Sequence, residues 1–103
     1  MSLATLILVD FLKLVYEILD LYKWLIIIGA ILSWLVAFNI INTSNRFVRL
    51  IGDFLYRLTE PALRRVRSVV PYVGGMDLSP LILIFLIWFL QAIIQDVIYK
   101  LVV

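Results

Sequence analysis

Six arginines recur along residues 44–70, and their guanidinium groups could bind phosphate or carboxylate. With Asp53 and Glu60, all of them except Arg65 follow one another at steps of three or four residues, which places them on one stripe of a helix. A planar guanidinium pairs with such groups through two parallel hydrogen bonds. Contact with anionic lipid headgroups, combined with a topology signal, is favoured over docking of a cytoplasmic partner. The six are Arg46, Arg49, Arg57, Arg64, Arg65 and Arg67.

A nucleic-acid site is not expected on this stripe, because stacking aromatic side chains do not interleave with the arginines. The chain has no cysteine and no histidine, which removes the thiolate and imidazole ligands and the usual general base. Its seven acids are scattered. Asp77, beside Gly74 and Gly75, is expected to cap a helix or to accept from Arg57 or Arg64 rather than to act in catalysis. We therefore expect no enzyme activity, metal, cofactor or small-molecule substrate.

Two further sets of residues are candidates for contact between helices. Gln91 and Gln95 stand one helical turn apart in an apolar stretch, where an unpaired amide costs on the order of several kcal/mol. Hydrogen bonding between helices is favoured over a polar permeation path. The second set, of small residues each four positions after the last, consists of Gly29, Ser33 and Ala37. Their spacing predicts a face that lets another helix approach closely, which is favoured over the alternative that small residues are simply common in membrane helices. In antiparallel spans, Gln91 and Ser33 should lie at similar depths.

The elements that must position these residues are predicted to be helices in a membrane. The chain has 103 residues and is 65% hydrophobic, with a mean hydropathy of +1.13, more apolar than a small soluble domain can bury. Two charge-free stretches approach the roughly 20 residues that cross about 30 Å of hydrocarbon. The predicted transmembrane helices around them are residues 22–42 and 80–99. Tyr22 and Trp24 suit the aromatic belt, and Pro80 can begin the second helix.

Between the spans, residues 44–70 are predicted to form an amphipathic interfacial segment. Apolar residues fill the side of the helix opposite the arginines. Ser44 or Asn45 can cap the start of the helix. Pro61 should break or kink it, and Thr59 would then cap a second helical piece. Residues 71–79 should form a Gly–Gly turn, after which Asp77 or Ser79 caps the second span.

Residues 2–20 are predicted to form a separate N-terminal amphipathic helix. Asp10, Lys13, Glu17 and Asp20 draw a narrow polar line along it, so it should lie on the membrane surface or pack against another subunit. The whole chain, 1–103, is thus predicted to be one all-α membrane domain with two transmembrane helices. The arginine-rich connection should lie in the cytoplasm and both termini outside.

Several runs in this sequence strongly resemble the YggT family of small integral membrane proteins. They are FLYRLTEP at 54–61, Arg64 and Arg65, and VPYVGGMDLSP at 70–80, together with ILSW at 31–34 and FLQ at 89–91. The chain carries one copy of this unit and lacks the Pro-rich turn that often follows Ser-Trp in relatives. The residues that carry the resemblance are Ser33, Trp34, Tyr56, Arg57, Thr59, Glu60, Pro61, Gly74, Gly75, Asp77, Ser79 and Pro80.

The resemblance implies a bacterial inner-membrane protein without enzymatic activity. Family members are associated with osmotic or ion stress tolerance, with cell division and with assembly of membrane and nucleoid components. Three hypotheses follow. The favoured one is a scaffold, assembly or stabilising subunit that contacts other transmembrane helices, as a homo-oligomer or in a larger complex. The others are a homo-oligomeric channel or transport accessory, and a membrane adaptor for cell-division or nucleoid machinery.

Overall fold

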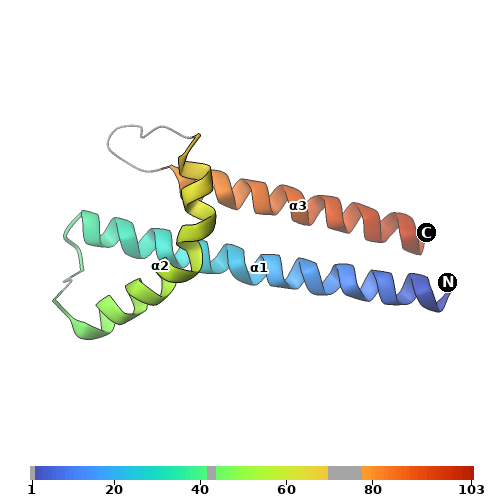
Figure 1. Cartoon of the computed structure of the whole chain (residues 1–103), viewed down its shortest axis with the longest axis horizontal. Coiled ribbons are helices and arrows are strands. Elements are labelled where there is room, and N and C mark those ends of the chain that lie inside the picture. The colour runs from blue at the N-terminus through green and yellow to red at the C-terminus, as the bar shows by residue number, and fades with distance from the viewer. Residues whose placement is uncertain (1, 42–43, 70–77) are drawn as a thin grey trace.

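Three α-helices make up the fold of this computed structural model, which describes residues 2–41, 44–69 and 78–103. They are α1 (Leu3–Ala37), α2 (Arg46–Arg67) and α3 (Ser79–Val102), and these described ranges contain no strand. Helices α1 and α3 run antiparallel, side by side, so that both termini lie at one end, and α2 crosses them towards the other end (Figure 1). The prediction of an all-α chain is confirmed.

Helix α1 is one uninterrupted helix of 35 residues, about 52 Å long at 1.5 Å per residue. Ser2 caps it, because its Oγ accepts a hydrogen bond from the backbone N–H of Thr5 at 3.1 Å. The predicted separate helix over residues 2–20 is therefore wrong, since it continues directly into the predicted first span. The physical reason is that no glycine or proline interrupts residues 3–28, while the charged residues between them are compatible with helix.

The end of α1 is set by a left-handed residue. Asn39 has φ of 59°, a conformation that Asn tolerates better than most side chains. The N–H of Ile40 donates to the carbonyl of Leu35 at 2.9 Å, and the N–H of Asn39 donates to Val36 at 3.1 Å. This pair of bonds is a Schellman motif, so the helix ends at Ala37 rather than at the predicted residue 42.

Helix α2 begins as predicted and then differs from the prediction. The Oδ1 of Asn45 accepts from the N–H of Phe47 at 2.8 Å and of Val48 at 3.3 Å, which confirms the cap. The helix then continues through Pro61 and bends along its length (Figure 1), so of the predicted break or kink, the break into two helices is wrong. A proline in the interior of a helix lacks one N–H and crowds the preceding turn, which bends the helix without ending it here.

Helix α3 starts with Ser79 and Pro80 in its first turn, as predicted. Leu78 occupies the N-cap position without a side-chain hydrogen bond, so the predicted capping by Ser79 is wrong. The predicted Gly–Gly turn, with Gly74, Gly75 and Asp77, lies outside the described residues.

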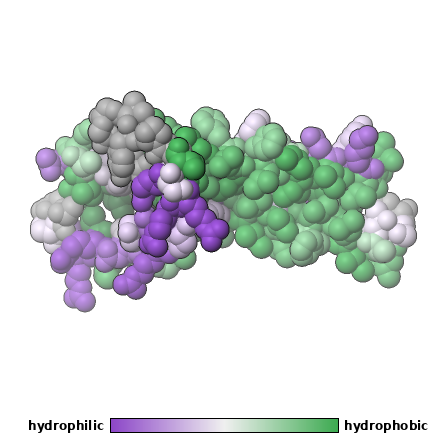
Figure 2. All heavy atoms as spheres, turned by 45° about the horizontal axis from the view of Figure 1, so that its top comes forward, coloured by the Kyte–Doolittle hydropathy of each residue, from purple (hydrophilic) through white to green (hydrophobic). Residues whose placement is uncertain are grey.

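The core that joins the three helices is small. Ile26, Leu63, Leu83 and Ile87 form its buried cluster, one contribution from each of α1 and α2 and two from α3. Helices α1 and α3 are both long and apolar enough to cross a membrane. Hydrophobic side chains cover the paired helices, and most hydrophilic ones gather over the end where α2 crosses (Figure 2). Below, the antiparallel pair α1–α3 is called the shaft, and α2 with residues 26–36 of α1 is called the head.

Candidate functional site: a recess in the head

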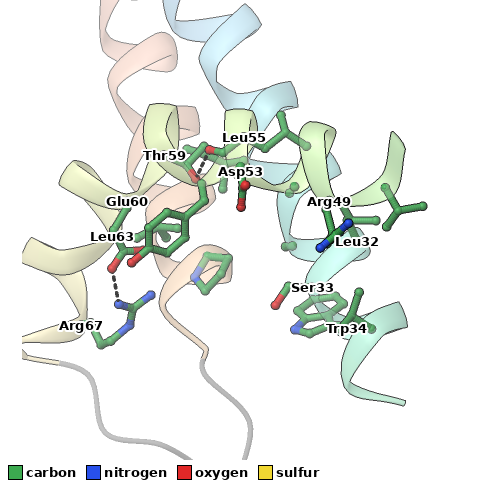
Figure 3. A pocket seen from close by; sticks show the side chains of 18 residues that line it. Leu32, Ser33, Trp34, Arg49, Asp53, Leu55, Thr59, Glu60, Leu63 and Arg67 are labelled. Carbon is green, nitrogen blue, oxygen red and sulfur yellow. Dashed lines mark hydrogen bonds and ion pairs between the residues drawn. The ribbon is translucent and has the colours of Figure 1, made fainter. Parts of the chain in front are cut away.

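A recess of about 410 Å³ lies between α1 and α2. Its apolar lining comes mainly from Ile26, Ala30 and Leu32 of α1 and from Leu55 and Leu63 of α2. Charged and hydroxyl-bearing side chains line it as well, and Figure 3 shows them converging from the two helices. A volume of this size with mixed lining is typical of sites that bind a molecule or a protruding segment. The polar lining residues are Ser33, Trp34, Arg49, Asp53, Tyr56, Thr59, Glu60 and Arg67.

Two glycines lie where the helices that form the recess cross. A Cβ added at Gly29 would lie 3.8 Å from the Cβ of Leu55, and one added at Gly52 would lie 3.6 Å from a methyl carbon of Leu32. Each glycine therefore faces a leucine of the other helix at ordinary contact distance. The hydroxyl of Tyr22 also donates to the carbonyl of Leu58 at 2.9 Å, which ties α1 to α2 beside this crossing.

The small residues predicted to form one packing face have three different surroundings. Gly29 packs against α2 of the same chain, so its space is already used. Ser33 is exposed and lines the recess. Ala37 is exposed at the end of α1 and does not line the recess. The structure thus assigns one of the three to internal packing and one to the candidate site.

Glu60 and Arg67 form an ion pair in the wall of the recess. The carboxylate of Glu60 is buried, at 7% exposure, and its Oε1 accepts from Nη1 of Arg67 at 2.7 Å. A buried carboxylate without such a partner is strongly unfavourable. Spacing by seven residues, two helical turns, was the signal in the sequence for this pair.

The six arginines of residues 44–70 therefore divide into two groups. Arg67 turns towards Glu60 and is half-buried. The other five side chains are exposed, and Arg49 among them also lines the recess. The exposed arginines are Arg46, Arg49, Arg57, Arg64 and Arg65.

The recess brings together residues of the sequence motifs that lie far apart in the chain. Ser33 and Trp34 come from α1, Tyr56, Thr59 and Glu60 from α2, and Pro80 from the start of α3. The Thr59 hydroxyl donates to the carbonyl of Leu55 at 2.8 Å within α2, so it does not cap a second helix as predicted. Ser79 is fully buried, whereas Arg57 and Pro61 are exposed and do not line the recess.

A second polar cluster, which we call the polar junction, links the two helices of the shaft. Nζ of Lys23 lies 3.3 Å from Oδ1 of Asp20 and donates to Oε1 of Gln91 at 3.0 Å. The Gln91 amide donates in turn to Asp20 Oδ1 and to the carbonyl of Tyr16, both at 3.3 Å. Gln95 donates to the Tyr16 hydroxyl at 3.3 Å. Gln91 is 3% exposed, so its amide faces protein rather than lipid.

The partners of Gln91 differ from those expected. The sequence suggested that Gln91 lies at the depth of Ser33, but it lies beside Asp20 and Lys23, more than two helical turns away along α1. A first span over residues 22–42 gives the wrong depth for Gln91, because α1 begins at Leu3 and meets α3 nearer the N-terminus of α1. The spacing of Asp20 and Lys23, which permits an ion pair on one face, was a signal that could have found this cluster.

The side-chain bonds in the wall of the recess lie within α2, whereas those of the polar junction join α1 to α3. In the recess, Glu60 is held by Arg67 and Thr59 by the backbone of its own helix. In the polar junction, the amide and the charged groups satisfy one another. Among the described residues, no group of three or more His, Cys, Asp or Glu side chains could hold a metal ion.

Comparison with known proteins relates the chain to sequences from several bacteria. It is 36% identical over 73 residues to an uncharacterized protein of Haemophilus influenzae, and this match covers 71% of the chain and 35% of that relative. It is 28% identical over 74 residues to the Escherichia coli K12 protein named "Uncharacterized protein YggT", covering 72% and 35% respectively. A Vibrio alginolyticus protein described only by its position in the proC 3′ region is 31% identical over 75 residues, covering 73% of the chain and 36% of that protein.

The matched segment spans about a third of the length of each of these relatives. No solved structure matches the chain. The sequence profile described as CCB3/YggT matches residues 8–98. That segment includes nearly all of the shaft, the whole of α2 and the residues that line the recess. The chain therefore belongs to the CCB3/YggT family.

Proposed function

We propose that the chain is a non-enzymatic membrane subunit that supports the assembly or stability of other membrane proteins through contacts between helices. One observation carries this proposal: large apolar side chains lie exposed around the shaft, for example Phe85 at 68% and Leu21 at 64% exposure. Each Å² of apolar surface left in water costs about 25 cal/mol. Lipid and neighbouring helices are the surroundings that suit such a surface.

The three faces of α2 support a place for the head at the lipid–water boundary. Leu55, Thr59 and Leu63 are buried against the other helices. A second face carries exposed apolar side chains, and the exposed arginines other than Arg65 lie beyond it. With the apolar face towards acyl chains, the arginines reach anionic headgroups, at about 1 kcal/mol of attraction each. The exposed apolar side chains of α2 include Phe47, Leu50, Ile51, Phe54 and Leu58.

The proposal places this protein in the bacterial inner membrane, with α2 on the cytoplasmic side. The recess is the contact point that we assign to a partner membrane protein. It offers an apolar floor with Arg49 and Asp53 beside it, so it suits a helix that presents an apolar side chain flanked by polar ones.

A tagged chain purified from native membranes in mild detergent tests the assembly role. Ser33→Leu fills the recess, and Ala4→Leu, a matched small-to-large change at an exposed position of the same helix, leaves it open. We expect the same partner to copurify with the wild type and with Ala4→Leu, and its yield to fall at least about tenfold with Ser33→Leu. Recovery of the chain alone, or equal yields from all three, would contradict the proposal.

The polar junction favours one alternative, a homo-oligomeric channel or transport accessory. Asp20 and Lys23 are charged residues within a helix long and apolar enough to span a membrane, and intramembrane charges often mark ion pathways. Two spans cannot enclose a pore, so several copies would be needed. Ion flux through liposomes that contain only this protein would support the alternative, whereas silent liposomes would eliminate it.

A further inference from the structure

Three charged side chains on α1 are exposed and have no partner in the described part of the chain. Asp10, Lys13 and Glu17 make no hydrogen bond or ion pair with any described residue, although their spacing of three and four residues would allow one. Asp20 and Lys23, on the same helix, are bound in the polar junction. The first half of α1 therefore presents charges that the fold of this chain does not use.

These charges belong to a longer row of residues with a regular spacing. The steps along the row alternate between three and four residues, which is the 3.5-residue period of a coiled-coil seam. Its apolar members Leu6 and Trp24 are 43% and 54% exposed. The buried residues of α1 are others, Val9, Ile26 and Ala30, although Asp20 of the row also accepts a hydrogen bond from Gln91 of α3. We call the row the α1 seam: Leu3, Leu6, Asp10, Lys13, Glu17, Asp20, Trp24, Ile27 and Ile31.

Neither water nor lipid is a favourable environment for this seam. Large apolar side chains such as Ile7, Phe11 and Ile18 are exposed beside it, which argues for hydrocarbon surroundings. A charged residue at the centre of a membrane helix costs about 2.5–3.5 kcal/mol when lipid surrounds it. A partner protein that covers these side chains and places charges of opposite sign beside them removes most of this cost.

The order of charges points to a second copy of this chain as the cover. Lys13 lies between Asp10 and Glu17, so the signs of these three unpartnered charges alternate, and the fourth charge of the seam, Asp20, is already bound by Lys23 and Gln91. When two copies run parallel about a two-fold axis, Lys13 of one copy can reach Glu17 of the other, since four residues rise about 6 Å. The symmetry forms this pair twice.

We propose that the α1 seam is the interface of a parallel homodimer, with Lys13–Glu17 pairs that fix its register. Polar residues at seam positions commonly specify the register of coiled coils. The match covers 72% of this chain but only 35% of the Escherichia coli relative, so that relative is about twice as long and has room for two copies of the described helices. The inference deepens the proposed function, on which it rests, by naming the partner of one face.

Single cysteines test the interface cleanly, because the chain contains none of its own. In native membranes under oxidising conditions, Leu6→Cys and Trp24→Cys should form a disulfide-linked species of twice 12.0 kDa. Ile7→Cys and Ile18→Cys, at exposed positions outside the seam, are the matched controls. We expect at least tenfold more dimer from the seam positions. Equal cross-linking at both sets, or none at the seam, would overturn the proposal.

A charge exchange tests the register in the Leu6→Cys background. Lys13→Glu alone and Glu17→Lys alone should each lower the dimer yield about tenfold, because like charges then meet. The double variant, Lys13→Glu with Glu17→Lys, should restore the yield, and failure to restore it would refute the pairing. A chain that does not dimerise but still copurifies with another membrane protein would refute the homodimer and leave the assembly function standing. If the chain dimerises but no other protein copurifies with it, the homodimer stands and the assembly function is refuted.

Discussion

Helix α1 meets its two neighbours in different ways. Along the shaft it is joined to α3 by side-chain hydrogen bonds, centred on Lys23 and Gln91. It meets α2 mainly by close packing, with a glycine of each helix facing a leucine of the other and a single side-chain hydrogen bond, from Tyr22 to the carbonyl of Leu58. The crossing leaves the recess open beside it. The two regions therefore differ in role: the contacts of the shaft fix how α1 and α3 align, and the head leaves space for the proposed contact with a partner protein.

If lipid surrounds the shaft, as we propose, the solvent accounts for this difference. Apolar side chains gain little by leaving lipid for another apolar helix, so close packing and polar bonds must join membrane helices. A buried amide such as that of Gln91 then specifies one register, because any shift leaves it unpaired. The head instead depends on a few close contacts and on the buried Glu60–Arg67 pair.

The largest effect should follow from breaking the ion pair in the head. Arg67→Met leaves the buried Glu60 carboxylate without its guanidinium, and we expect the free energy of unfolding to fall by about 3 kcal/mol. Arg64→Met, at an exposed position one turn earlier, is the control and should change it by less than about 0.5 kcal/mol. Unfolding in mixed micelles, followed by far-UV circular dichroism, measures both. Equal losses would mean that the pair does not stabilise the head.

A change at the glycine crossing should have an intermediate effect. Gly29→Leu crowds Leu55, and overpacking of this kind costs typically about 1–3 kcal/mol. Gly29→Ala adds only a Cβ at 3.8 Å, which is ordinary contact, so its stability should match or slightly exceed that of the wild type. The same unfolding measurement compares the two. A neutral Gly29→Leu would show that α2 does not approach α1 as closely as described.

The smallest effects should come from the glutamines of the shaft. Gln91→Leu removes the amide that links Lys23 and Asp20 to α3, and we expect a loss of about 1–2 kcal/mol. Gln95→Leu removes one bond at an exposed position and should cost less than about 0.5 kcal/mol. If the two variants were equally stable, the polar junction would not be centred on Gln91.

Local signals in the sequence were sufficient for part of this fold. The Asn45 cap, Pro80 in the first turn of α3 and two apolar helices follow from residue type and spacing alone. The extent of α1 did not, because Asp20 and Lys23 look like a boundary until Gln91 is known to pair with them. Continuation of α2 through Pro61 depends on tertiary packing of Leu55 and Leu63 on either side, which no local rule contains.

The candidate site was predictable only as separate pieces. Ser33, Trp34, Tyr56, Thr59 and Glu60 were singled out from their sequence context, but nothing in their spacing placed them around one recess. That arrangement follows from the crossing of α1 and α2 at Gly29 and Gly52. The small-residue pattern was interpreted as a face for another subunit, because a sequence does not say which helix fills a groove.

The central claim is that the shaft lies in hydrocarbon and the head at the cytoplasmic surface. Labelling of single cysteines with a membrane-impermeant maleimide tests it directly, using Phe85→Cys in the shaft and Arg57→Cys in the head, both exposed side chains. We predict that Arg57→Cys reacts in inside-out vesicles, whereas Phe85→Cys reacts only after detergent dissolves the membrane. Labelling of Phe85→Cys in intact vesicles, or of Arg57→Cys only from the outer side, would contradict the account.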